Sequence, residues 1–224
     1  MNKEILRKRL DDVIWKIERA RLEVNEHQII QLVAVSKYTT AENIKTLYSL
    51  GQRAFGENHV QQLKARGIEL EDLPIEWHMI GTLQKNKINK LLEIKPSLFQ
   101  ALDSIELARE LEKKLANKNQ TLNCLIEIHS SKEATKSGLS PQSSIETYLQ
   151  IQEECPHIKL QGVMTIGAHT DDTKIIQASF ETTHKIYEKL QKNGANICSM
   201  GMSGDFELAI KCGSNLVRVG SSLF

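Results

Sequence analysis

The hydrophobic positions of the chain change their period several times. From residue 2 to about residue 27 an apolar side chain recurs every three or four positions, and charged side chains fill the opposite face. This period predicts one amphipathic α-helix. A coiled coil would show the same spacing, but a segment of fewer than about four heptads followed by a strand favours a helix packed on its own domain.

A short apolar run, a polar or glycine-containing turn and a segment of helical period then repeat to the end of the chain. Such alternation indicates parallel strands joined by helices. The predicted strands span residues 32–37, 53–58, 75–81, 97–102, 122–129, 159–166, 196–202 and 215–219. The predicted helices span 41–50, 59–66, 84–93, 104–117, a segment after Pro141, 172–193 and 205–212.

Eight strands alternating with seven helices, behind an extra N-terminal helix, predict an α/β protein with a (β/α)8 barrel of the TIM type. An open doubly wound sheet would need fewer strands or a longer chain, and the glycine fingerprint of dinucleotide binding is absent. No low-complexity linker divides the 224 residues. Because single barrels commonly have this size, we predict one domain, residues 1–224, with residues 1–27 packed on the barrel.

Charge and cysteine usage exclude several classes of partner. The 29 Lys and Arg residues nearly balance the 28 Asp and Glu residues, so no net field favours nucleic acid or an anionic membrane. The four cysteines form no CxxC pair and no Cys/His cluster, which predicts reduced core thiols and no metal site. The charged N-terminus and the lack of an apolar run of about 18 residues predict a cytoplasmic protein without a membrane span.

Lys37 ends the first predicted strand, and this position makes it a candidate functional residue. Active sites of barrels gather at the carboxyl ends of the strands. A lysine in apolar or cationic surroundings loses its proton more readily, and its neutral amine forms a Schiff base with an aldehyde. The alternative is a solvent-exposed charge that merely ends a strand.

Two turns rich in glycine and serine follow the seventh and eighth strands, where barrels often bind phosphate. They are residues 202–204, which include Ser203, and residues 220–222, which begin with Gly220 and Ser221. Small residues let backbone N–H groups approach an anion, hydroxyls donate to it, and a helix beginning near Asp205 turns its positive end toward it. Taken singly, each turn is also compatible with an ordinary loop.

A Schiff-base lysine and a phosphate site in one barrel suggest pyridoxal 5'-phosphate (PLP) as the ligand. Arg218 would then face the ring of the cofactor. An arginine always donates, so next to the pyridine nitrogen it would keep that nitrogen unprotonated and weaken the ring as an electron sink. The alternative is that Arg218 is a structural donor to a carboxylate inside the barrel.

Six ordered motifs extend this interpretation. They are residues 33–37 (VAVSK), 55–58 (FGEN), 77–87 (WHMIGTLQKNK), 136–138 (KSG), 200–205 (MGMSGD) and 218–220 (RVG). Together they resemble the pyridoxal phosphate homeostasis protein family. The resemblance implies a barrel like the N-terminal domain of alanine racemases, with Lys37 as the Schiff-base residue and Arg218 at the pyridine nitrogen. It further implies three phosphate-binding residues, Ser203, Gly220 and Ser221, and Asn58 beside the cofactor.

The sequence departs from that family at two internal positions. Ser221 stands where threonine is usual, which keeps the hydroxyl. His129 replaces an asparagine of the fifth-strand motif, so the role of that position is open.

Several other polar residues have more than one interpretation. We expect His78 to be a hydrogen-bonded barrel side chain rather than a proton shuttle. Glu57 and Asn58 either cap the next helix or contact a ligand. The basic helix face is expected to be solvated; it comprises Lys85, Lys87 and Lys90. Lys136, in the loop after the fifth strand, is a candidate to take the cofactor from Lys37 or to pass it on.

Two classes of function follow. We predict a non-catalytic, monomeric PLP-binding protein that buffers or delivers the cofactor, with recipient apo-enzymes as candidate partners. The alternative is a PLP-dependent racemase of the alanine racemase type, which needs a second acid/base group. The resemblance places that group in an additional β-domain and a partner subunit, and the polar residues at the predicted strand ends include no tyrosine. A structural or interaction role rests only on the N-terminal helix.

Overall fold

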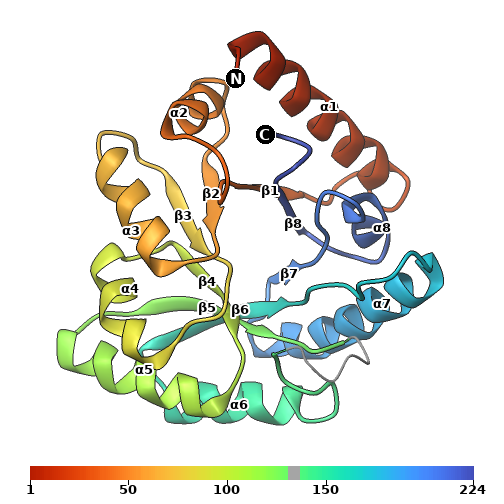
Figure 1. The fold of residues 1–224 in the computed structure, drawn as a ribbon. Helices are drawn as coiled ribbons and strands as arrows, with labels where there is room; N and C mark the ends of the chain where they lie inside the picture. The colour runs from red at the N-terminus through yellow and green to blue at the C-terminus, as the bar shows by residue number, and fades with distance from the viewer. Residues whose placement is uncertain (131–136) are drawn as a thin grey trace.

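The structure is a computed structural model that describes residues 1–130 and 137–224. Its centre is a closed parallel barrel in which each strand pairs with the next and the last pairs with the first (Figure 1). The strands are β1 (Gln31–Val35), β2 (Ala54–Glu57), β3 (Glu76–Met79), β4 (Leu98–Leu102), β5 (Leu122–Glu127), β6 (Ile158–Met164), β7 (Ile197–Ser199) and β8 (Leu216–Val219). The predicted (β/α)8 barrel is confirmed.

Helices alternate with the strands and surround the barrel in Figure 1. They are α1 (Lys3–Leu22), α2 (Ala41–Ser49), α3 (Val60–Glu69), α4 (Ile88–Ile94), α5 (Ile105–Lys118), α6 (Ser144–Glu154), α7 (Thr173–Leu190) and α8 (Phe206–Lys211), with 3-10 turns at Lys85–Lys87 and Gln191–Asn193. Two predicted boundaries are confirmed. The Ser104 hydroxyl accepts from the Leu107 N–H at the start of α5, and Gly51 takes a positive φ of 109° just after α2.

Helix α1 packs its buried stripe against the barrel side of the molecule, next to α8 and α2. This confirms the packed helix and not the coiled coil. The predicted end at residue 27 is wrong, because α1 ends at Leu22 and the chain turns through Val24 and Asn25, whose N–H groups both bond the Arg21 carbonyl. Val24, which extended the apolar pattern in the sequence, is about half exposed.

The strands are shorter than predicted, so some polar residues expected at strand ends lie instead in the loops that follow the strands. The strand predicted for residues 32–37 ends at Val35, so Lys37 lies in the turn that follows it. The strand predicted to reach His129 ends at Glu127. A barrel closes with a ladder of a few residues per strand, so polar residues just beyond each ladder form the mouth of the barrel.

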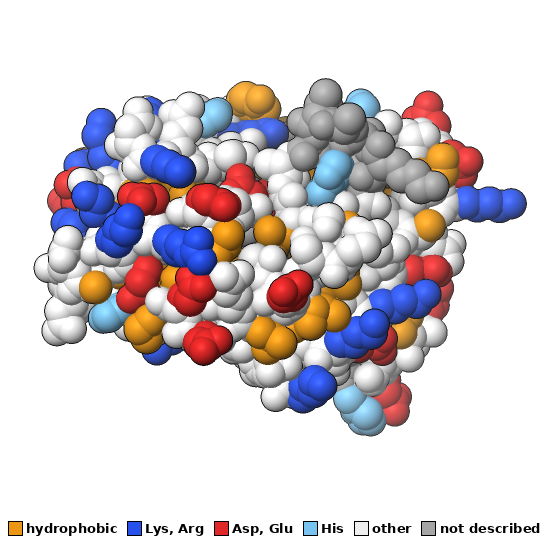
Figure 2. All heavy atoms as spheres, turned by 90° about the horizontal axis from the view of Figure 1, so that it is seen from below, with side chains coloured by type: hydrophobic (Ala, Val, Ile, Leu, Met, Phe, Trp, Pro, Cys, Tyr) orange, Lys and Arg blue, Asp and Glu red, His pale blue; other side chains and the backbone are white. Residues whose placement is uncertain are grey.

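The surface and the cysteines agree with the composition. Figure 2 shows Lys, Arg, Asp and Glu side chains interspersed over one face of the molecule. All four cysteines are free, and three of them are buried. Within the described residues, no helix combines the length and the apolarity needed to cross a bilayer, and no group of three His, Cys, Asp or Glu side chains is arranged to hold a metal ion.

Candidate functional site

A cavity of about 1060 Å³ opens at the carboxyl ends of the strands. Its lining includes all six residues that the sequence singles out: Lys37, Asn58, Ser203, Arg218, Gly220 and Ser221. These residues come from four different strand ends, so it is closure of the barrel that brings them together. A concave site with a few convergent polar groups is the usual form of a small-molecule site.

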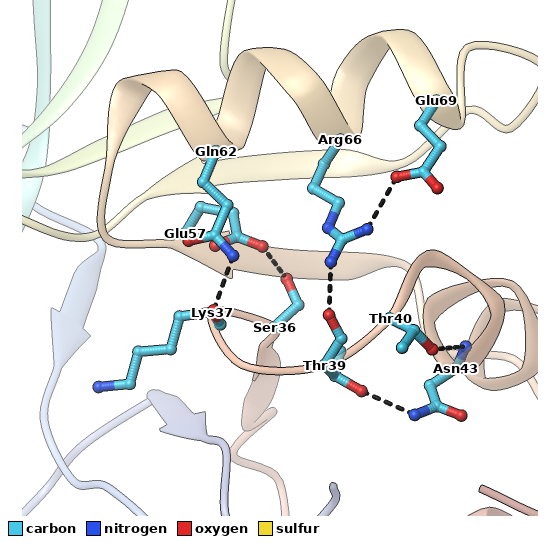
Figure 3. A network of polar contacts seen from close by, with 9 residues as sticks. All are labelled: Ser36, Lys37, Thr39, Thr40, Asn43, Glu57, Gln62, Arg66 and Glu69. Carbon is cyan, nitrogen blue, oxygen red and sulfur yellow. Dashed lines mark hydrogen bonds and ion pairs between the residues drawn. The ribbon is translucent and has the colours of Figure 1, made fainter.

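The loop that carries Lys37 is held from behind by α3, as Figure 3 shows. The side-chain amide of Gln62 donates to the Lys37 carbonyl at 2.7 Å, and Arg66 donates to the Thr39 carbonyl. The Lys37 side chain extends away from these contacts (Figure 3), so its backbone is anchored on the side away from its amine, and Lys37 lines the cavity.

Glu57 completes the anchoring of this loop. The Ser36 hydroxyl donates to its Oε1 at 2.7 Å inside the barrel, and burial raises the pKa of the Glu57 carboxyl. Helix α3 begins at Val60 with His59 as its N-cap residue. The interpretation of Glu57 and Asn58 as the cap of this helix is therefore wrong.

Asn58 is placed in the cavity wall by a close approach of two loops. A Cβ atom on Gly81 would overlap the Asn58 carbonyl group. Only glycine lets the ends of β2 and β3 come this near. The residues of the FGEN and WHMIG motifs are thus adjacent in space.

The turns after β7 and β8 are joined directly. The Gly220 N–H donates to the Ser203 hydroxyl at 3.1 Å, and the Asp205 carboxylate accepts from the Met202 N–H at 2.6 Å. Burial raises the pKa of Asp205. Ser203, Gly220 and the exposed Ser221 therefore form one side of the cavity, with small side chains and polar hydrogens.

Arg218 is only 4% exposed and lies on β8, with its side chain reaching the cavity. Its Nη2 donates to the Thr165 carbonyl at 2.8 Å and its Nη1 donates to the Ser199 hydroxyl. Burial lowers the pKa of the guanidinium to about 10, so it stays cationic at neutral pH. Within the part of the chain that the structure describes, its hydrogen-bond acceptors are a carbonyl and a hydroxyl, and not the carboxylate that the structural alternative required.

His78 has the structural role that the sequence predicts. The Gln100 amide nitrogen lies 2.8 Å from its Nδ1, and the Ser199 hydroxyl donates to the Gln100 carbonyl oxygen at 2.7 Å. Burial lowers the pKa of His78 to about 4, so the imidazole is neutral over most of the physiological range. It is a hydrogen-bonded barrel side chain.

The sequence analysis missed two titratable residues of the cavity. Tyr38 is 92% exposed at the mouth, with its ring centroid 5.0 Å from the Lys37 amine. Glu127 is 5% exposed, and its Oε2 has no hydrogen-bond partner in the part of the chain that the structure describes. Burial and the like charge of Asp103 raise the pKa of Glu127 to about 7. Because Tyr38 lies at the mouth of the cavity, the prediction that no tyrosine lies at the strand ends is wrong.

The lysines of the basic helix face, His129 and Lys136 are the remaining candidates, and they differ in their positions. Lys85 and Lys90 are exposed, as expected of a solvated helix face, whereas Lys87 is half-buried and lines the cavity. His129 donates its backbone N–H to the Leu139 carbonyl at 2.9 Å, and its buried Nε2 has no hydrogen-bond partner among the described residues. Lys136 lies outside the described residues.

The similarity to known proteins covers nearly the whole chain. The family model described as the alanine racemase N-terminal domain matches residues 11–224. A Helicobacter pylori protein named pyridoxal phosphate homeostasis protein is 51% identical over 218 residues, which are 97% of each chain. The human protein of the same name is 38% identical over 209 residues, with 87% of this chain and 75% of the human one covered.

Solved structures agree on the fold. PipY of Synechococcus elongatus with PLP bound superposes with a TM-score of 0.84 at 29% identity, covering 98% of this chain and 99% of PipY. Alanine racemase of Clostridium difficile has a TM-score of 0.76 at 19% identity, which shows the shared barrel alone, over 99% of this chain and 56% of the racemase. From its motifs, its barrel and these matches, the chain belongs to the pyridoxal phosphate homeostasis protein family, built on the alanine racemase N-terminal domain.

Proposed function

We propose that this protein binds PLP in the barrel cavity, with Lys37 as the residue that holds its aldehyde as a Schiff base, and that it serves PLP homeostasis without catalysing a reaction. The observation that carries the proposal is the convergence of the Lys37 amine with the Ser203 and Gly220 turns in one cavity. The H. pylori relative carries the corresponding name, and PipY has been solved with PLP bound.

The residues present fit this ligand. The hydroxyls of Ser203 and Ser221 are donors suited to a phosphate group, since the Ser203 oxygen accepts from the Gly220 N–H and keeps its own proton, and Asn58 adds an amide to the wall. Arg218 supplies a cation for the ring nitrogen, which accepts a hydrogen bond when unprotonated. When bound, PLP supplies an aldehyde that condenses with amines and a ring that withdraws electrons.

The charge state of Arg218 supports a carrier role. Its pKa near 10 means that it donates at neutral pH and does not hand over a proton. A ring nitrogen paired with such a donor stays unprotonated, which limits the withdrawal of electrons that catalysis needs. We propose a cytoplasmic, monomeric, single-domain carrier, residues 1–224, that buffers PLP or delivers it to apo-enzymes.

One observation supports the racemase alternative. Tyr38 and Glu127 are titratable groups in the same cavity as Lys37, so a second acid/base candidate is present. Incubation of the purified protein with amino acids in deuterated water separates the two functions. The carrier predicts no exchange of the α-proton above the rate of free PLP, and enzymic exchange would support a racemase.

Binding is tested by the absorbance spectrum of protein incubated with PLP, followed by borohydride reduction and peptide mass mapping. We expect a visible band and a phosphopyridoxyl adduct on Lys37. Lys37→Ala should lose both, whereas Lys45→Ala, at an exposed position of α2, should keep both. A wild-type protein that stays colourless with added PLP would refute the proposal.

A further inference from the structure

Four side chains form a hydrogen-bonded series across the interior of the barrel. His78 of β3, Gln100 of β4, Ser199 of β7 and Arg218 of β8 are each at most 4% exposed. The series runs from Arg218 to Ser199, from Ser199 to Gln100 at 2.7 Å, and from Gln100 to His78 at 2.8 Å. Because β4 lies across the closed barrel from β8, this series links Arg218 to the opposite wall.

The chemistry of arginine and the orientation of the Gln100 amide together fix the direction of every bond in the series. A guanidinium only donates, so the Ser199 oxygen must accept from Arg218. Ser199 has a single hydroxyl proton, which is therefore free to donate to the Gln100 oxygen. The Gln100 amide then presents an N–H to His78, whose Nδ1 must be unprotonated to accept it.

The other Nη group of Arg218 is held by a different strand end. Nη2 donates to the Thr165 carbonyl at 2.8 Å, just after β6. Two bonds to acceptors on separate strands fix both the position and the tilt of a planar group. These bonds use two of the five N–H donors of an arginine, and the side chain also lines the cavity.

We propose that Ser199, backed by Gln100 and His78, is a positioning residue that aims Arg218 at the ligand and thereby sets the electronic state of the bound ring. This inference rests on the proposed PLP function. A hydrogen bond to a charged group contributes more than a neutral one, and its acceptor here is buried and cannot be replaced by bulk water. Loss of the Ser199 hydroxyl would let the guanidinium tilt and let Gln100 rotate.

The test on the ligand site is Ser199→Ala, which removes one oxygen from a buried position. We expect PLP affinity to fall about tenfold and the pH at which the absorbance of bound PLP changes to shift from its wild-type value. Ser199→Thr keeps the hydroxyl and should restore both values toward wild type. Unchanged affinity and unchanged pH dependence in Ser199→Ala would overturn the proposal.

Ser214→Ala is the matched control. Ser214 is also buried, and among the described residues its hydroxyl bonds only backbone groups, those of Cys198, Met200 and Leu216. Its loss should lower thermal stability while leaving the affinity for PLP and the pH dependence of absorbance unchanged. If both serine variants alter the bound ligand alike, Ser199 is only a structural residue and the proposal fails.

A second measurement needs neither a variant nor a ligand. Nitrogen NMR of the ligand-free protein should show His78 as the neutral tautomer with the proton on Nε2, because Nδ1 accepts from Gln100. The Nδ1–H tautomer would contradict the direction of the series. A wild-type protein that fails to bind PLP refutes the proposed function, whereas normal wild-type binding with an unaffected Ser199→Ala refutes only this inference.

Discussion

Gln62 holds the backbone of Lys37 through a 2.7 Å hydrogen bond from its side-chain amide to the Lys37 carbonyl. The donor lies on α3 and the acceptor lies in the turn after β1, so two segments separated in sequence by α2 and β2 meet at this point (Figure 3). Because the amine of Lys37 reaches the cavity from this turn, its position depends on a helix that does not itself supply the amine.

We predict that Gln62→Ala loosens the turn without unfolding the barrel. One lost hydrogen bond in a half-buried position corresponds to about 1 kcal/mol of the free energy of unfolding. Amide hydrogen exchange should accelerate in residues 37–40, and PLP should bind several-fold more weakly. Lys64→Ala is the control on the same helix, since Lys64 pairs with Glu93 on the outside at 2.7 Å. Equal exchange in residues 37–40 in both variants would contradict the prediction.

Local patterns in the sequence were sufficient to predict the barrel and, together with the family resemblance, six cavity residues. Lys37, Ser203 and Arg218 each follow or end an apolar run, and the barrel topology then determines that such ends meet. Gln62 could not be found in this way, since nothing near it in the sequence indicates that its side chain reaches the Lys37 carbonyl. Contacts between elements arise from packing, which the pattern of one segment does not contain.

Tyr38 and Glu127 were missed for a different reason. Each lies within two residues of a predicted strand end, and boundaries drawn from apolar runs carry that uncertainty. With the first strand extended to Lys37 and the fifth strand to His129, Glu127 counted as an interior strand residue, whereas β5 ends at Glu127 and β1 already ends at Val35, before Lys37 and Tyr38. A shift of two residues is small for the fold but decides which side chains face the cavity.

Gly81 gives a prediction about the wall beside Asn58. In Gly81→Ala the new methyl group would overlap the Asn58 carbonyl, so the two loops must separate. We expect a loss of about 1–3 kcal/mol in the free energy of unfolding, measured by urea denaturation, together with weaker PLP binding.

Gly67→Ala is the control for that experiment, and we expect it to change the stability in the opposite direction. Gly67 lies within α3, and a Cβ atom there would meet no atom within 4 Å. Alanine in a helix interior is favoured over glycine by about 1 kcal/mol, so this variant should gain stability. If Gly81→Ala is as stable as wild type, the close approach of the two loops is not a constraint.

Glu127 gives a prediction about pH. Its pKa rises from an ordinary value near 4.5 to about 7 in the folded protein, mainly through burial. Between these values the folded state keeps a proton that the unfolded chain has lost, so the contribution of Glu127 to stability is complete below pH 4.5 and is lost as the pH rises to about 7. A shift of this size corresponds to at most about 3 kcal/mol.

The contribution of His78 to stability depends on pH in the opposite direction to that of Glu127. Its pKa falls from 6.5 to about 4 on burial, so its contribution to stability is present above pH 6.5 and is lost as the pH falls toward 4. Because the two shifts are similar in size and opposite in sign, their contributions to the pH dependence largely offset each other between about pH 4.5 and 6.5. The wild-type protein should therefore show little pH dependence from this pair of residues.

A variant without the Glu127 carboxyl separates the two opposing contributions to the pH dependence of stability. Glu127→Gln is neutral at every pH, so its free energy of unfolding relative to wild type should rise steadily between pH 4.5 and 7 and then level off. Urea denaturation at half-unit steps of pH measures this difference, and His78→Gln should produce a difference of the opposite slope between pH 4 and 6.5. Because each comparison is made against wild type, the surface carboxylates cancel and a flat difference can only mean that the buried group titrates at its ordinary pKa.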